Sequence, residues 1–223
     1  RSAAASSSSG VVLTAEQEAA VQTPPGVPML LFAPAGSGKT GTLAARAEFL
    51  QDWQPTNTHI LALTFTNKAA CELRERMPKG VHVFTFDKFV IDWVRSRECA
   101  RGQQPFKLAL RAQQRRFICE AAAGTPHAVA GDDDGEGLLR KYDRGKLHGD
   151  GDQVIDAYKE KLQEAGLVDL IGVRGLAKTE LARARYEDAP LVLPKDVVRI
   201  LHLIVDELQD TSLDQLKVIL AFA

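Results

Sequence analysis

The chain has 223 residues, of which 45% are hydrophobic and 26% are charged, as is ordinary for a globular protein. This length can bury the core of one large domain or two small ones. No apolar run approaches the roughly eighteen residues of a membrane span, so no membrane partner is expected. The formal net charge of −1 also argues against a strongly basic nucleic-acid-binding protein.

The first elements in chain order are a tail, a short helix and a strand. Residues 2–9 are only Ser and Ala, so residues 1–10 are interpreted as a flexible tail, a linker or a processed targeting segment. Thr14 with Gln17 three residues later has the spacing of a capping box that starts a helix. Residues 24–26 end that helix, and the apolar run at residues 29–32 predicts a strand.

The segment after this predicted strand is rich in glycine and opens a helix that runs toward Trp53. Backbone N–H groups and a helix N-terminus directed at one point suit a polyphosphate. We expect Lys39 to reach the terminal phosphates and the Thr40 hydroxyl to ligate Mg²⁺. The first position of this motif is usually Gly and is Ala33 here, a modest departure. The expected nucleotide-binding residues of the loop are Ala35, Gly36, Ser37, Gly38, Lys39 and Thr40.

Further buried strands are predicted at residues 60–65, 81–86 and 200–205, with a helix at 66–77. Apolar strands that alternate with helices indicate an α/β protein with a mostly parallel sheet. The strand at 200–205 ends in Asp206 and Glu207. Asp206 is expected to bind the metal, and Glu207 to position or deprotonate the attacking water.

Residues 99–189 have a different pattern, which is helical and charged and predicts an inserted subdomain. Within residues 95–119 the basic side chains outnumber the acids, and these arginines and lysine are interpreted either as a phosphate-tracking face or as a solvated helix surface. Cys71, Cys99 and Cys119 have no metal-ligand spacing, so buried, reduced thiols in an intracellular protein are expected.

Several motifs together resemble the UvrD/Rep-like superfamily 1 DNA helicases. They are Gln17, the loop at residues 33–40, the string Thr-Phe-Thr-Asn-Lys-Ala-Ala at 64–70, Thr85-Phe86, and Asp206-Glu207 with Gln209-Asp210-Thr211. The resemblance covers about residues 11–98 and 199–223, roughly half of the chain. It implies a RecA-like P-loop NTPase core at residues 11–98 and 190–223, with an accessory helical insertion at 99–189.

The resemblance also implies roles for individual residues. Gln17 corresponds to a glutamine that reads adenine, although its capping role is a serious alternative. Phe65, Thr66, Asn67 and Thr85 correspond to residues that contact single-stranded DNA, with base stacking on Phe65; the alternative is that Phe65 is part of the core. Asp87 stands where the family usually has His, which puts a DNA contact by this side chain in doubt.

The implied function is that of an ATP- and Mg²⁺-dependent 3′→5′ helicase acting in processes such as DNA repair, in the nucleus, the cytoplasm or a DNA-containing organelle. A second RecA-like domain in the same polypeptide would be required, and its absence from these residues predicts weak ATP binding and little hydrolysis. Two alternatives stay open, namely the helicase subunit of a RecB/AddA-type helicase–nuclease and a non-catalytic module that binds DNA or a partner.

Overall fold

The computed structural model describes residues 13–34, 36–53, 58–128, 134–145, 150–186 and 199–222, so the predicted tail at residues 1–10 lies outside them. The chain divides into two compact units. The first comprises Arg1–Trp93 and Leu181–Ala223, and the second comprises Val94–Glu180. The assignment of these parts to helicase subdomains stays a prediction.

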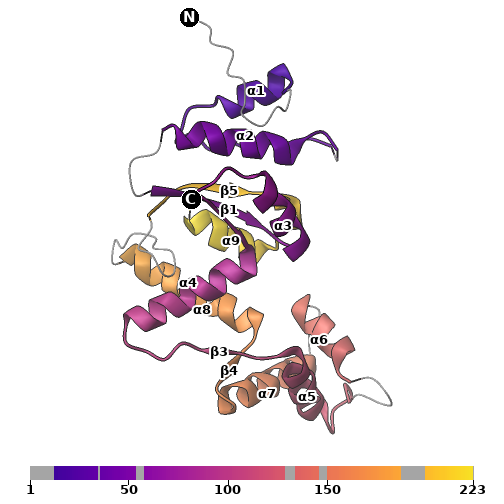
Figure 1. Ribbon diagram of the computed structural model, residues 1–223. Helices are drawn as coiled ribbons and strands as arrows, with labels where there is room; N and C mark the ends of the chain where they lie inside the picture. The colour runs from indigo at the N-terminus through magenta and orange to yellow at the C-terminus, as the bar shows by residue number, and fades with distance from the viewer. Residues whose placement is uncertain are drawn as a thin grey trace, which may run out of the picture. The chain divides into compact units, whose positions relative to one another are not determined.

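The first unit contains a three-stranded sheet with the order β2-β1-β5 (Figure 1). Strand β1 (Thr58–Thr64) is central and runs parallel to both β2 (Val81–Thr85) and β5 (Arg199–Val205). The predicted parallel sheet and mixed α/β class are therefore confirmed. Since the strands are parallel, their carboxyl ends share one edge, which is where ligand sites form in such sheets.

Helices cover both faces of this sheet. Helices α2 (Lys39–Gln51) and α3 (Asn67–Arg76) pack on one face, with Ala47 and Leu73 against Ile60 and Ala62 of β1. On the other face, α4 (Phe86–Ala100) contributes Phe89, whose ring lies 6.3 Å from that of Phe84. In the view of Figure 1, α1 (Ala15–Val21) and α2 lie above the strands, and α9 (Leu213–Phe222) lies below them.

The strand predicted at residues 29–32 is not formed. This segment is irregular, and Phe32 is 85% exposed. A β-strand is stable only when its backbone groups pair with a neighbouring strand, and within the described chain β5 is hydrogen-bonded to β1 alone. The prediction of a strand here was wrong: in the described structure the segment pairs with no strand, because apolar composition alone does not determine strand pairing.

The second unit is mainly helical, as the pattern of residues 99–189 predicted. It contains α5 (Arg111–Ala122), α6 (Glu136–Asp143), α7 (Asp150–Glu164) and most of α8 (Leu170–Tyr186). Ile118, Leu139 and Tyr158 are fully buried in its core. A two-stranded parallel pair that the sequence did not indicate joins β3 (Lys107–Leu108) to β4 (Leu167–Val168).

The expectation of buried cysteines was wrong. Cys71 and Cys99 are exposed and Cys119 is half-buried, with no disulfide among them. Cysteine's average preference for the interior therefore did not predict the positions of Cys71 and Cys99. A search of the described helices finds none that is long and apolar enough to cross a membrane.

Candidate functional site

The glycine-rich loop leads directly into α2. Gly36 and Gly38 have φ angles of +78° and +84°, a conformation that favours glycine, and Gly38 is the N-cap of the helix. The Ser37 N–H and hydroxyl both donate to the Pro34 carbonyl, at 3.3 and 2.8 Å. The loop is therefore a compact turn at a helix N-terminus, the arrangement that binds anions. Ala35 lies outside the described residues.

Lys39 is the first residue of α2, and its ammonium is bonded to the loop itself. The Nζ atom donates to the carbonyl of Ala33 at 3.0 Å and to that of Pro34 at 3.2 Å. Thr40 lies beside it, half-buried, in the first helical turn. The cation is thus held within the loop, where it can exchange backbone carbonyls for the oxygens of an incoming phosphate.

Gln17 joins the start of α1 to the same loop. Its Oε1 accepts from the Thr14 N–H at 2.9 Å, which completes the predicted capping box, while its Nε2 donates to the Ser37 carbonyl at 2.8 Å. The capping interpretation is confirmed. The contact with Ser37 shows that one rotamer caps α1 and reaches the loop at once, a combination that the spacing did not predict.

Asp206 and Glu207 follow β5 at the carboxyl edge of the sheet. The Asp206 N–H donates to the Leu63 carbonyl at 2.9 Å, which carries the β1–β5 ladder one step further. The Asp206 side chain is buried, and this burial, followed by the neighbouring Glu207 carboxylate, raises its pKa above the ordinary value. Glu207 has φ 53° and ψ 45°, a left-handed conformation rare for a residue with a side chain.

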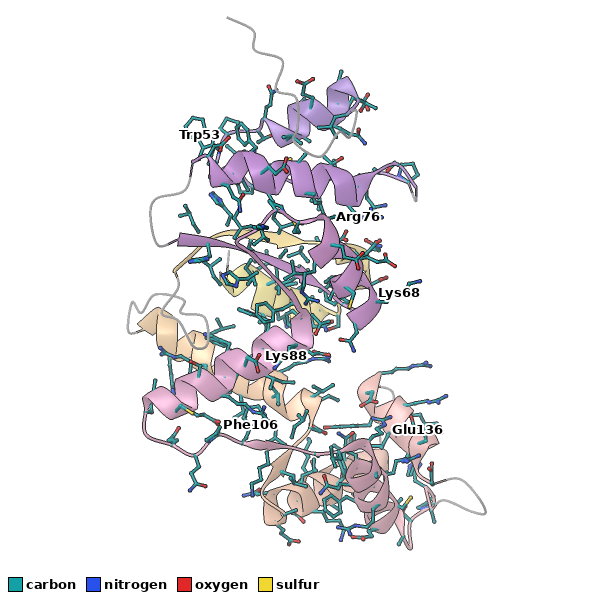
Figure 2. All side chains as sticks on the ribbon, viewed as in Figure 1. Trp53, Lys68, Arg76, Lys88, Phe106 and Glu136 are labelled. Atoms are coloured by element: carbon teal, nitrogen blue, oxygen red, sulfur yellow. The ribbon has the colours of Figure 1, made fainter. Side chains whose placement is uncertain are left out.

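Two cations act on Asp206 in the opposite direction. Lys39 and Arg76 both lower its pKa, so their positive charges lie within electrostatic reach of this carboxylate. That Lys39 and Asp206 act together at one nucleotide site stays a prediction. Arg76, at the end of α3, was missed, because an arginine in the last turn of a helix is common in sequences. Figure 2 labels its side chain beside α3.

Glu207 has a partner that the sequence did not indicate. Its Oε2 accepts a short hydrogen bond from Gln209 Nε2, and its backbone N–H donates to Asp206 Oδ1 at 3.1 Å. The left-handed turn at Glu207 allows the chain to fold back so that Gln209 meets the carboxylate. One oxygen of the Glu207 carboxylate is thus held by Gln209.

The donor set at this edge fits Mg²⁺, which prefers oxygen ligands and keeps several waters. The Thr40 hydroxyl and the Asp206 carboxylate supply such oxygens. In the described portion of the chain, no three His, Cys, Asp or Glu side chains gather into a metal cage. A divalent ion here would therefore depend on water and on the phosphates of its nucleotide for the rest of its ligands.

The residues expected to contact DNA lie near the carboxyl ends of β1 and β2. Phe65 is half-buried, with its ring stacked at 6.1 Å on that of Phe86, so part of it packs in the core. Thr66 and Asn67 are exposed, and the Thr66 hydroxyl caps α3 by accepting from the Ala69 N–H at 3.1 Å. The Thr85 hydroxyl accepts from the Lys88 N–H at 3.3 Å.

The basic residues at 95–119 are largely engaged within the second unit. Arg95 lies 5.0 Å from the Phe106 ring, a cation–π contact. Other arginines of this segment pair with carboxylates: Arg97 and Arg101 with Glu180, Arg111 with Glu136 and Asp143, Arg115 with Asp134, and Arg116 with Glu120. The structure therefore favours a structural role over a free phosphate-tracking face.

The fold and the candidate site define a parallel α/β protein whose strand edge carries a glycine-rich loop, a lysine and two carboxylates. A family model described as the UvrD/REP helicase N-terminal domain matches residues 13–223, so this chain belongs to that family. The resemblance found in the sequence motifs is confirmed.

Curated relatives agree with this assignment. The chain is 32% identical, over 88% of its own length, to the ATP-dependent DNA helicase PcrA of Leuconostoc citreum. It is 47% identical over 70 residues to PcrA of Staphylococcus aureus, which is 31% of this chain and 10% of that protein. The chain spans 29% of the length of the Leuconostoc relative.

Proposed function

We propose that this chain is the ATP-binding, RecA-like part of a UvrD-like helicase that moves 3′→5′ along single-stranded DNA, with residues 99–189 as its accessory insertion. The observation that supports this most is geometric: Lys39 opens α2 directly after the tight glycine turn at Gly36 and Gly38, and Asp206 is buried at the carboxyl end of β5. A phosphate-binding cation and a metal-binding acid at one edge are what ATP hydrolysis requires.

In this proposal each side chain has one task. Lys39 releases the carbonyls of Ala33 and Pro34 and binds the terminal phosphates, while the backbone N–H groups of residues 36–40 orient them. Thr40 and Asp206 hold Mg²⁺, which supplies charge neutralisation at the phosphates when bound. The Glu207 Oε1 takes the proton of the attacking water, while Gln209 holds Oε2 in place.

The Gln17 side chain would have to give up two hydrogen bonds before it could bond to adenine. An amide that pairs with adenine uses both its oxygen and its nitrogen, and here these atoms are bonded to the Thr14 N–H and the Ser37 carbonyl. Nucleotide binding would replace both hydrogen bonds, so that the amide that bonds Thr14 and Ser37 would instead form hydrogen bonds with the adenine base.

The DNA and the second domain complete the proposal. Phe65, Thr66, Asn67 and Thr85 would contact single-stranded DNA near the ends of β1 and β2, where Asn67 and Thr66 are exposed. Because the chain spans 29% of a curated relative, a second RecA-like domain in the same polypeptide would supply the remaining catalytic groups. These 223 residues alone would bind Mg-ATP weakly and hydrolyse it slowly.

Titration of the chain with Mg-ATP, with Lys39→Ala as the test variant, examines this proposal. Charge-assisted hydrogen bonds to phosphate are strong, so the variant should lose at least about tenfold in affinity. Its fold should persist, because the Lys39 ammonium bonds to its own loop. Lys159→Ala is the matched control, since Lys159 is an exposed lysine of α7 that pairs only weakly with Asp156, at 3.6 Å.

Equal Mg-ATP affinity in the chain and in Lys39→Ala would contradict the ATPase assignment. That outcome would favour the alternative of a module that keeps the fold and binds DNA or a protein without using nucleotide.

A further inference from the structure

Thr64, the last residue of β1, has a hydroxyl that is buried without a partner. The residue is 0% exposed, and among the described residues its Oγ1 makes no hydrogen bond. Buried polar groups are nearly always bonded, and an orphaned one requires an explanation. Valine would fill the same space at a β-strand position without this cost. The hydroxyl therefore points to a ligand that binds beside it.

The register of the sheet places Thr64 next to Asp206. Leu63 pairs with Val205, and the Asp206 N–H continues the ladder to the Leu63 carbonyl, so Thr64 and Asp206 are the next neighbours across the two strands. Side chains alternate along a strand. Ala62 and Ile204, two residues earlier in each strand, share the core cluster with α2, so Thr64 and Asp206 belong to that same face.

The two side chains face the same side of the sheet from neighbouring strands, at a spacing of about 4.5–5.5 Å between Cβ atoms. Thr64 Oγ1 makes no hydrogen bond among the described residues, so a bridging water is a partner that could satisfy it together with Asp206. Asp206 is itself buried. We propose that the Thr64 hydroxyl is a positioning group that, together with Asp206, holds a water of the Mg²⁺ hydration shell; this inference rests on the proposed function.

The inference predicts effects of opposite sign from one substitution, Thr64→Val. In the empty chain the variant removes an unsatisfied hydroxyl, so the melting temperature should rise by about 2–4 °C. In the presence of Mg²⁺ and a non-hydrolysable ATP analogue, affinity should fall about three- to tenfold, the effect of one lost hydrogen bond. With EDTA in place of Mg²⁺, the affinity for the analogue should not change.

Two further variants separate this role from a packing effect. Thr64→Ser keeps the hydroxyl and should retain the Mg²⁺-dependent part of the affinity. Thr211→Val is the matched control, because the Thr211 Oγ1 is likewise buried without a partner in the described structure but lies beyond the strand, after η1 (Leu208–Asp210). It should raise the melting temperature of the empty chain and leave the Mg²⁺ dependence unchanged.

The measurements distinguish two failures. If the unsubstituted chain binds the analogue no better than Lys39→Ala, the proposed function fails, and this inference fails with it. If binding is normal and Thr64→Val keeps the full gain in affinity from Mg²⁺, only the role of Thr64 is overturned. Loss of that gain in Thr64→Ser, with the hydroxyl present, would also overturn it.

Discussion

The two units of the chain use their charged side chains in different ways. In the unit Val94–Glu180, arginines pair with carboxylates from distant parts of the sequence, as Arg101 does with Glu180 and Arg111 with Glu136. At the carboxyl edge of β1 and β5, by contrast, Lys39 is bonded to its own loop, and Asp206 is buried beside another carboxylate. In the first case the charges stabilise the fold; in the second, the proposed function requires them to be available to a ligand, at some cost in stability.

The largest change in stability is expected from substitution of Arg101, whose charge pair belongs to the second unit. The Glu180 side chain is 5% exposed, and its carboxylate accepts hydrogen bonds from both terminal nitrogens of Arg101, Nη1 and Nη2. The Nε atom of Arg97 lies 3.7 Å from Glu180 Oε2. Arg101→Met leaves a buried charge with a poorer partner and should destabilise this unit by about 3 kcal/mol. Hydrogen exchange of the α5 and α7 amides would measure the loss locally.

The control for this prediction is Arg116→Met. Its pair with Glu120 is exposed and spans 3.6 Å on one helix, so the change should be within about 0.5 kcal/mol. Adding Glu180→Gln to Arg101→Met should recover part of the loss, because the stranded charge is then gone. Equal exchange rates in Arg101→Met and Arg116→Met would show that the buried pair does not hold this unit together.

Substitution of Asp206 should stabilise the chain, whereas substitution of Arg101 should destabilise it. Its pKa is raised in the folded chain, so the folded state binds the proton more tightly than the unfolded state, and stability falls as pH rises through this pKa. Asp206→Asn removes the charge and should raise the melting temperature of the empty chain by a few degrees at neutral pH. The gain should shrink as the pH falls through the raised pKa toward the ordinary pKa of an aspartate, and it should vanish below that, where Asp206 is protonated in both the folded and the unfolded chain.

Thermal melts at pH 4 and pH 7.5 would test this sign, with Asp210→Asn as the control, since Asp210 is exposed in η1. A lower melting temperature for Asp206→Asn at neutral pH would mean that Asp206 stabilises the empty fold, contrary to the contrast between the units.

The sequence predicted those parts of this molecule that depend on local pattern. The strands at 60–65, 81–86 and 200–205 were found within one or two residues, because apolar runs between turn residues report buried strands. The capping box at Thr14 was found because its partners are three residues apart. The strand predicted at 29–32 is not formed, since strand pairing depends on a neighbouring strand that composition does not reveal.

The parts of the site that escaped sequence analysis depend on contacts across the fold. Gln17 reaches Ser37 over twenty residues, and Arg101 meets Glu180 over seventy-nine. The importance of Thr64 depends on its place in the fold, because its hydroxyl is buried next to Asp206 across the sheet and makes no hydrogen bond within the described part of the chain. Motifs in the sequence indicated which residue types could take part in chemistry. Which of these residues are buried, and which lie next to one another, became clear only from the register of β1 and β5.

The smallest effect is expected at Glu136, whose ion pair with Arg111 is half-buried. Its pKa is lowered to about 2, first by the hydrogen bond from Arg111 and then, to a lesser extent, by that from Arg140. A depressed pKa means that the pair contributes to stability above the ordinary pKa of a glutamate, near 4.5, and that this contribution is lost as pH falls from there toward 2. Figure 2 labels Glu136 on α6.

An NMR titration of the Glu136 carboxyl would therefore rank its two partners. Arg111→Gln should return the pKa most of the way toward its ordinary value, and Arg140→Gln should raise it less, since Arg111 binds through two nitrogens at 3.0 Å and Arg140 through one at 3.2 Å. The part of the stability difference between Arg111→Gln and the unsubstituted chain that comes from Glu136 should be lost as pH falls through about 2, where Glu136 becomes protonated. A larger rise of the Glu136 pKa in Arg140→Gln than in Arg111→Gln would show that the stabilising contact lies within α6 and not between α5 and α6. The second unit would then depend less on charge pairs between distant residues than its other ion pairs indicate.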